Sequence, residues 1–115
     1  MNTSDDLSTC CRDKVLARRF SAMAHPARLE ILRHLAERDA CCCKDVVGRV
    51  GLAQSTVSQH LKILQEAGLV DFRQERPRSR YTINKEALDE TRAQMNSFLG
   101  TCCASGEDQL KHSSI

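Results

Sequence analysis

The chain has 115 residues, a formal net charge of +2, and 41% hydrophobic residues that include only three Phe and one Tyr. Its length fits a single domain, and no apolar run approaches the roughly 20 residues of a membrane-spanning helix. No basic stretch followed by an apolar block opens the sequence, so we expect no secretory signal and a cytoplasmic protein. A core of Leu, Val, Ile and Ala favours helices.

The first half of the chain predicts three helices. Apolar residues recur every three or four positions over residues 13–24 and again over 26–37. His25-Pro26 separates these two helices, because the residue before proline is pushed out of the helical region. A shorter third helix is predicted between Asp39, which caps its start, and Gly51. The apolar positions are Leu16, Phe20 and Met23, then Leu29, Ile31, Leu32 and Leu35, then Val46, Val47 and Val50.

The second half predicts a helix, a hairpin and a last helix. The fourth helix covers 54–67, and Gly68 stands where a C-cap glycine belongs. Residues 69–73 and 80–83 alternate with period two, as strands do, and the charged turn between them makes a hairpin with a basic tip. In the fourth helix the apolar face is Val57, Leu61 and Leu64.

The last helix is predicted to start near residue 84 and to end near Gly100, with a polar tail after it. The chain is therefore predicted to be mainly α with a small β-hairpin. We divide it into an N-terminal arm over 1–12, a central domain over 13–100, and a C-terminal tail over 101–115.

The order of these elements is that of a winged helix-turn-helix, which points to double-stranded DNA. Residues 52–85 carry six basic and three acidic side chains, a local charge of +3. Short polar side chains on the fourth helix suit base edges in the major groove, and basic ones neutralise phosphates. The predicted DNA-contacting residues are Gln54, Ser55, Thr56, Ser58, Gln59, His60, Lys62, Arg76, Arg78 and Arg80.

Seven cysteines form three clusters, Cys10-Cys11, Cys41-Cys42-Cys43 and Cys102-Cys103. An odd number cannot pair completely within one chain, and the cytosol keeps thiols reduced. Thiolates select soft, thiophilic ions, so all seven are candidate metal ligands. Catalysis by a reactive cysteine is disfavoured, because the sequence has no glycine-rich turn from a strand into a helix.

Three segments, residues 25–32, 52–64 and 67–70, resemble the ArsR/SmtB family of metal- and metalloid-responsive repressors. The resemblance spans about residues 13–100 and is strongest in Ser58-Gln59-His60-Leu61. It implies a homodimer of winged-helix protomers that leaves a palindromic operator when an inducer binds, in a metalloid-resistance operon. The implied dimer contacts, from the first and last helices, are Leu16, Phe20, Met95, Phe98 and Leu99.

The inducer is expected to be trivalent arsenic or antimony, which forms three short bonds to sulfur. Two adjacent cysteines and a third from elsewhere suit that geometry, whereas tetrahedral zinc prefers spaced pairs. By the resemblance, Cys10-Cys11 joins the 41–43 cluster of the other subunit, whereas Cys102-Cys103 resembles the vicinal pair at the end of the last helix in another branch. Which of these clusters holds the inducer stays open, and Cys102-Cys103 is also expected as a second site or as a site for a methylated arsenical. Two alternatives remain open. These are a repressor responsive to cadmium, lead or zinc, and a redox or sulfide sensor based on the thiols.

Overall fold

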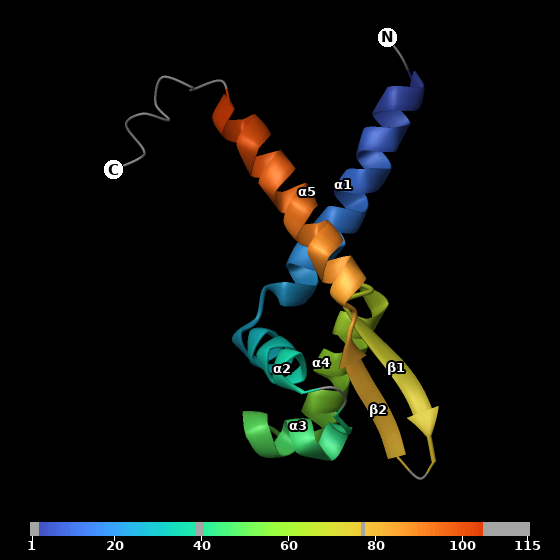
Figure 1. The fold of residues 1–115 in the computed structure, drawn as a ribbon, viewed down its shortest axis with the longest axis vertical. Helices are drawn as coiled ribbons and strands as arrows, with labels where there is room; N and C mark the ends of the chain where they lie inside the picture. Colours follow the sequence, from blue (N-terminus) through green and yellow to red (C-terminus); the bar gives the residue numbers. More distant parts are fainter. Residues whose placement is uncertain (1–2, 39–40, 77, 105–115) are drawn as a thin grey trace, which may run out of the picture.

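The computed structural model describes residues 3–38, 41–76 and 78–104, with the backbone alone for residues 3–10. It consists of α1 (Thr3–Met23), α2 (Pro26–Glu37), α3 (Cys43–Val50), α4 (Gln54–Glu66), β1 (Val70–Glu75), β2 (Arg78–Ile83) and α5 (Lys85–Ala104). Helices α2, α3 and α4 and the hairpin form one body, and α1 and α5 cross above it and diverge (Figure 1). The prediction of a mainly helical fold with a small hairpin is confirmed.

The core lies where α2, α3 and α4 meet the base of the hairpin. Ile31 of α2, Val46 of α3 and Leu61 of α4 are fully buried, and Leu69 and Val70 close the core at the start of β1. Each fully buried aliphatic side chain contributes about 1.5–3 kcal/mol relative to its exposed state. This packing fixes α4 and leaves its opposite face in solvent.

Pro26, Gly51 and Gly68 act at the helix ends as the sequence predicts. The Nδ1 atom of His25 accepts a hydrogen bond from the backbone N–H of Ala27, and Pro26 occupies the first turn of α2, where its missing N–H costs nothing. Gly51 and Gly68 have φ of 77° and 82°, a left-handed conformation that glycine adopts without strain. They end α3 and α4 and allow each following segment to turn back onto the core.

The prediction for the two outer helices was wrong at their free ends. Helix α1 begins at Thr3 instead of near residue 13, and α5 continues to Ala104 instead of ending near Gly100. Residues 3–12 contain one apolar side chain beyond cysteine, so apolar periodicity gave no signal there. Gly100 lies inside α5 and lacks a positive φ, since one helical glycine costs only about 1 kcal/mol. Both vicinal cysteine pairs therefore lie within helices.

Smaller differences concern α2, α3 and the hairpin. Leu29, predicted to be part of the apolar face of α2, is 40% exposed, and the cap of α3 is Cys42. Asp39, the predicted cap, lies outside the described residues, as does most of the polar tail. The strands are longer than predicted, so Arg78 and Arg80 lie in β2 and Arg76 at the turn.

The hairpin is antiparallel, with Val70 opposite Ile83 and Glu75 opposite Arg78. Phe72 and Tyr81 pair across the strands with ring centroids 5.2 Å apart. Tyr81 also exchanges two backbone hydrogen bonds with Cys41, which ties the segment before α3 to β2. Among the described helices, none is long and apolar enough to cross a bilayer.

Candidate nucleic-acid interface and cysteine segment

The outer face of α4 carries most of the predicted DNA-contacting residues. Its inner face, Val57, Leu61 and Leu64, is buried, which leaves the other side of the helix in solvent. Five of the predicted residues are exposed along this side, namely Gln54, Ser55, Ser58, Gln59 and Lys62. Thr56 and His60 are half-buried at its margin. The structure therefore presents a stripe of short polar side chains on a single helix, as major-groove contact requires.

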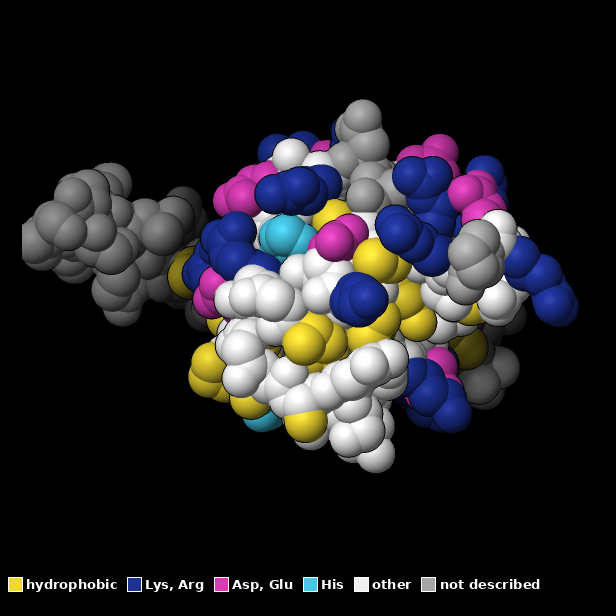
Figure 2. Space-filling model, turned by 90° about the horizontal axis from the view of Figure 1, so that it is seen from below, with side chains coloured by type: hydrophobic (Ala, Val, Ile, Leu, Met, Phe, Trp, Pro, Cys, Tyr) yellow, Lys and Arg dark blue, Asp and Glu magenta, His cyan; other side chains and the backbone are white. Residues whose placement is uncertain are grey.

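Basic side chains flank this stripe. Seen from the end that carries α3 and the hairpin turn, most Lys and Arg side chains lie toward the edges of the surface, while basic and acidic groups also lie near its middle among uncharged polar and hydrophobic ones (Figure 2). Arg76, Arg78 and Arg80 are exposed on the hairpin. Glu75 lies 3.3 Å from Arg80 and 3.7 Å from Arg73, so part of the positive charge of the hairpin is neutralised within it.

Replacing Glu75 by glutamine is expected to strengthen binding to any duplex DNA, because it frees two guanidinium groups for phosphates. The slope of log affinity against log salt should steepen by about 1 for each additional phosphate contact. Fluorescence anisotropy of a labelled, unrelated duplex over a salt series measures this slope. Glu86→Gln, at the exposed start of α5, is the matched control, and an equal change in both variants would contradict a role for the hairpin charge.

His60 connects α4 to α1 and α2. Its Nδ1 atom accepts a hydrogen bond of 3.2 Å from Nε of Arg28, whose Nη1 atom also donates to the carbonyls of Ser21 and Ala22. The ring of His25 lies 4.6 Å from that of His60. Burial, together with the positive charge of His25 and Arg28, lowers the pKa of His60 from its ordinary 6.5. Through Arg28, His60 thus links α4 to α2 and to the end of α1.

Acidification is expected to destabilise the fold through His60. Because its pKa is lower in the folded than in the unfolded chain, the unfolded chain binds the proton more readily. The contribution of His60 is complete above pH 6.5 and is lost as the pH falls toward its folded pKa. Thermal unfolding from pH 8 to pH 5 measures this, and His60→Gln, whose amide can still accept from Arg28, should flatten the profile. An unchanged profile in the variant would contradict this role.

Cys41 occupies a different environment from the two cysteines after it. Its side chain is 2% exposed, and its backbone N–H and C=O bond to Tyr81 at 3.0 and 2.7 Å. Burial, followed by the negative charge of Asp45, raises the pKa of the Cys41 thiol. A buried thiol with a raised pKa is a poor nucleophile and a poor ligand, so its geometry suits a structural role.

Cys42 and Cys43 are half-buried at the start of α3, and Cys43 packs against the edge of the core. The backbone N–H and the Sγ atom of Cys42 donate to Oδ2 of Asp45 at 3.3 and 3.4 Å, an arrangement that caps the helix. These bonds lower the pKa of Asp45. The Sγ atom of Cys43 lies 3.6 Å from Oγ of Ser58 on α4. The two thiols are thus on adjacent residues, and that of Cys43 contacts α4.

The remaining cysteines lie far along the diverging helices. Cys11 of α1 and Cys102 and Cys103 of α5 are exposed, and the side chain of Cys10 lies outside the described residues. Within the described residues of one chain, no three side chains of His, Cys, Asp or Glu are grouped so that they could hold a metal ion. A site with three thiolates therefore requires a donor from a second chain or from residues outside the described part.

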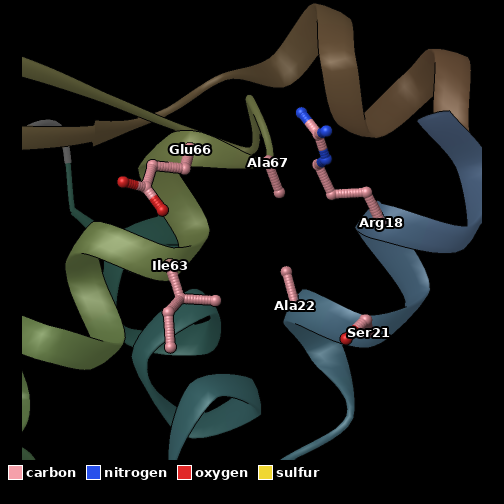
Figure 3. Close-up of a pocket in the computed structure, with 6 residues that line it drawn as sticks. All are labelled: Arg18, Ser21, Ala22, Ile63, Glu66 and Ala67. Carbon is pink, nitrogen blue, oxygen red and sulfur yellow. The ribbon is translucent and has the colours of Figure 1, made fainter. Parts of the chain in front are cut away.

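A groove between α1 and α4 is a different kind of surface. Arg18 and Glu66 lie on its opposite sides, with Ala22, Ile63 and Ala67 around them (Figure 3). None of the described cysteines contributes to its lining. Its chemistry is therefore that of an ordinary polar surface groove, and it adds no soft donor to the cysteine segment.

Sequence reasoning missed three contacts that shape this site. These are the hydrogen bond of Arg28 to His60, the ion pairs of Glu75 with Arg73 and Arg80, and the contact of Cys43 with Ser58. The spacing of Cys42 and Asp45 is that of a capping box and could have located the helix start. The contacts of Arg28 with His60 and of Cys43 with Ser58 join residues 32 and 15 positions apart, which no local pattern reports. The ion pair of Glu75 with Arg80 depends on the pairing of β1 with β2.

Comparison with known proteins places this arrangement in context. Residues 25–71 match the family model described as bacterial regulatory protein, arsR family. The arsenical resistance operon repressor of Bacillus subtilis (strain 168) is 35% identical over 71 residues, which are 62% of this chain and 68% of that protein.

Two solved structures share the fold. An ArsR-like transcriptional regulator from Rhodococcus sp. RHA1 has a TM-score of 0.72 at 24% identity, over 88% of this chain and 93% of that one. A homodimeric winged helix-turn-helix DNA-binding domain from Mycobacterium bovis has a TM-score of 0.67 at 24% identity, over 84% and 89%. The winged helix-turn-helix assignment is thereby confirmed.

Proposed function

The chain belongs to the ArsR family of bacterial regulatory proteins and is a DNA-binding transcriptional regulator, not an enzyme, and we propose that it is a repressor released from its operator by trivalent arsenic or antimony. One observation carries this proposal. Cys42 and Cys43 are adjacent accessible thiols at the start of α3, and one of them contacts the DNA-facing helix. An ion bound there acts directly on the surface that holds DNA.

The chemistry of this pair suits a metalloid. Neighbouring Cα atoms lie about 3.8 Å apart, close enough for two sulfurs to hold one thiophilic ion. Cys41 is a less suitable ligand because it is buried and its pKa is raised. We therefore assign Cys42 and Cys43 as two donors and leave Cys41 as the anchor of the segment.

We propose that the third donor comes from Cys10 or Cys11 of a second subunit. No third ligand accompanies the pair among the described residues of one chain, and α1 extends away from the body that holds α3 (Figure 1). Cys102 and Cys103, exposed at the end of α5, form a second site or bind a methylated arsenical through two thiols.

The intersubunit site has a direct test by mixing subunits. All variants also carry Cys102→Ser/Cys103→Ser, which removes the second pair. A dimer with Cys10→Ser/Cys11→Ser in one subunit and Cys42→Ser/Cys43→Ser in the other then retains one complete site. We expect neither homodimer of the variants to bind arsenite with high affinity and the mixed dimer to bind one ion. Gel filtration followed by arsenic analysis counts the ions. Absence of binding by the mixed dimer would contradict the assignment.

For DNA, we propose that Gln54, Ser55, Thr56, Ser58 and Gln59 reach base edges in the major groove. Lys62, Arg76, Arg78 and Arg80 would contact phosphates. These contacts position the protein and give salt-dependent affinity without reading sequence. His60, bonded to Arg28, serves this surface by holding α4 in place.

We propose that the active form is a homodimer through α1 and α5. Val15, Phe98 and Leu99 are 44%, 47% and 50% exposed on these helices, and beyond their crossing the helices do not pack on the body (Figure 1). Isolated helices are marginally stable in water, so these segments need a partner. The homodimeric domain of Mycobacterium bovis has the same fold.

In a dimer, the two α4 helices must match the fixed spacing of two operator half-sites. Joining the start of α3 to the α1 helix of the partner would move one recognition helix relative to the other. A coupling free energy of about 1–3 kcal/mol corresponds to a loss of operator affinity of roughly 5–150-fold.

The test is a titration of the reduced protein on its own promoter DNA, followed by anisotropy. Arsenite, antimonite, methylarsenite, cadmium, zinc and peroxide are compared in parallel. We expect release by the trivalent metalloids alone. Release by cadmium or zinc would indicate a four-ligand site, and release by peroxide alone would indicate a thiol-based redox sensor. Either result would contradict the proposed inducer.

A further inference from the structure

The hydrogen bond between Cys43 and Ser58 joins the cysteine segment to the DNA-facing surface. The Sγ and Oγ atoms are 3.6 Å apart, and either can be the donor. Cys43 is the first residue of α3, whereas Ser58 lies one turn into α4 on its exposed side. A thiol and a base-facing hydroxyl therefore share one contact, although they are 15 residues apart.

The position of this segment is fixed from its other end. Cys41 exchanges two backbone hydrogen bonds with Tyr81 and is buried in the core. Asp45 accepts two hydrogen bonds from Cys42. These bonds hold the backbone on both sides of Cys43. A change at the Cys43 sulfur therefore acts first on its hydrogen bond to Ser58, before it moves the backbone.

The donor in this bond depends on the state of the sulfur. A thiol S–H can donate to Oγ of Ser58, which leaves the hydroxyl proton free for a base or a phosphate. On ligation, Cys43 gives its proton to a hydroxide that leaves arsenous acid as water, and its sulfur takes the place of that hydroxide without change of oxidation state. The sulfur then has lone pairs only, so the Ser58 hydroxyl must become the donor.

We propose that Ser58 is the residue that transmits ligation to the operator, because its hydroxyl donates to DNA when Cys43 is a thiol and to sulfur when Cys43 is a ligand. The inference rests on the proposed function and names a route for its coupling. A dimer carries two such hydroxyls. A hydrogen bond in each half-site corresponds to about threefold to tenfold in affinity, and two correspond to about 10- to 100-fold.

The test measures operator affinity of the full-length protein with and without arsenite, for the wild type and for Ser58→Ala. The variant should bind arsenite as the wild type does, which arsenic analysis after gel filtration checks. Without arsenite, its operator affinity should fall about 10- to 100-fold. With arsenite, the variant and the wild type should bind operator equally, because the hydroxyl no longer contributes. Low salt keeps the weaker complexes measurable.

Ser55→Ala is the matched control, because it removes a hydroxyl from the same exposed face of α4. It should lower the two affinities by the same factor and preserve the response to arsenite. Ser58→Thr, which keeps a hydroxyl, should restore the wild-type response. The inference is overturned if Ser58→Ala lowers the arsenite-free and arsenite-loaded affinities equally. A wild type that binds arsenite but stays on the operator would instead contradict the proposed function, and the inference with it.

Discussion

The variant Cys42→Ser/Cys43→Ser is expected to remain bound to the operator when arsenite is added. Without arsenite, its operator affinity should be close to that of the wild type. Serine retains the small size and the hydrogen-bonding capacity of cysteine, so the cap on Asp45 and the contact with Ser58 can persist. A hydroxyl is a poor ligand for a thiophilic ion. Anisotropy on promoter DNA should show less than a threefold change in arsenite-free affinity, since no ion pair or buried group is lost.

The contrasting variant is Cys102→Ser/Cys103→Ser. These residues are exposed in the last turn of α5, at the end of that helix that points away from α3 and α4 (Figure 1). Their replacement should leave arsenite release intact. Release of the Cys42/Cys43 variant by arsenite at wild-type concentrations, or its loss in the Cys102/Cys103 variant, would contradict the assignment of the inducer site.

Phe98→Glu/Leu99→Glu is expected to give a monomer that has lost most of its operator affinity. Both side chains are about half-exposed on α5, and a charge at each position opposes burial against a second copy. Two linked half-site contacts exceed one by about 10²- to 10⁴-fold, so the affinity should fall by at least 100-fold. Light scattering gives the mass, and anisotropy gives the affinity.

Ala93→Glu provides the control for this change. It places the same charge at an exposed position on the other side of α5, as follows from 3.6 residues per turn. This variant should remain dimeric and should bind the operator normally. A dimeric Phe98/Leu99 variant with full affinity would show that the dimer forms through another surface.

The extent to which sequence predicted this structure varies with the kind of signal. Helix α2 and helix α4 were predicted within a residue, because Pro26 and Gly68 mark their ends and apolar side chains repeat at helical spacing. The start of α1 and the end of α5 were missed, because their surfaces carry no apolar stripe to read.

The sequence predicts which residues make up the site, but not which of them contact one another. The polar stripe on α4 follows from the residues opposite Val57 and Leu61, and the structure brings it to one surface. Cys41 is buried, unlike Cys42 and Cys43, because its backbone pairs with Tyr81. Three consecutive cysteines in the sequence give no sign of this difference. The orientation of His60 depends on Arg28, 32 residues away.

Arsenite binding and operator binding are proposed to oppose each other, and thermodynamic linkage between the two gives the most direct test. Arsenite affinity is measured for the free dimer and for the dimer saturated with operator. The account predicts that operator weakens arsenite binding by the same factor, about 5–150-fold, by which arsenite weakens operator binding. Equal arsenite affinity in the two forms would contradict it, because the thiols would then bind the ion without affecting DNA.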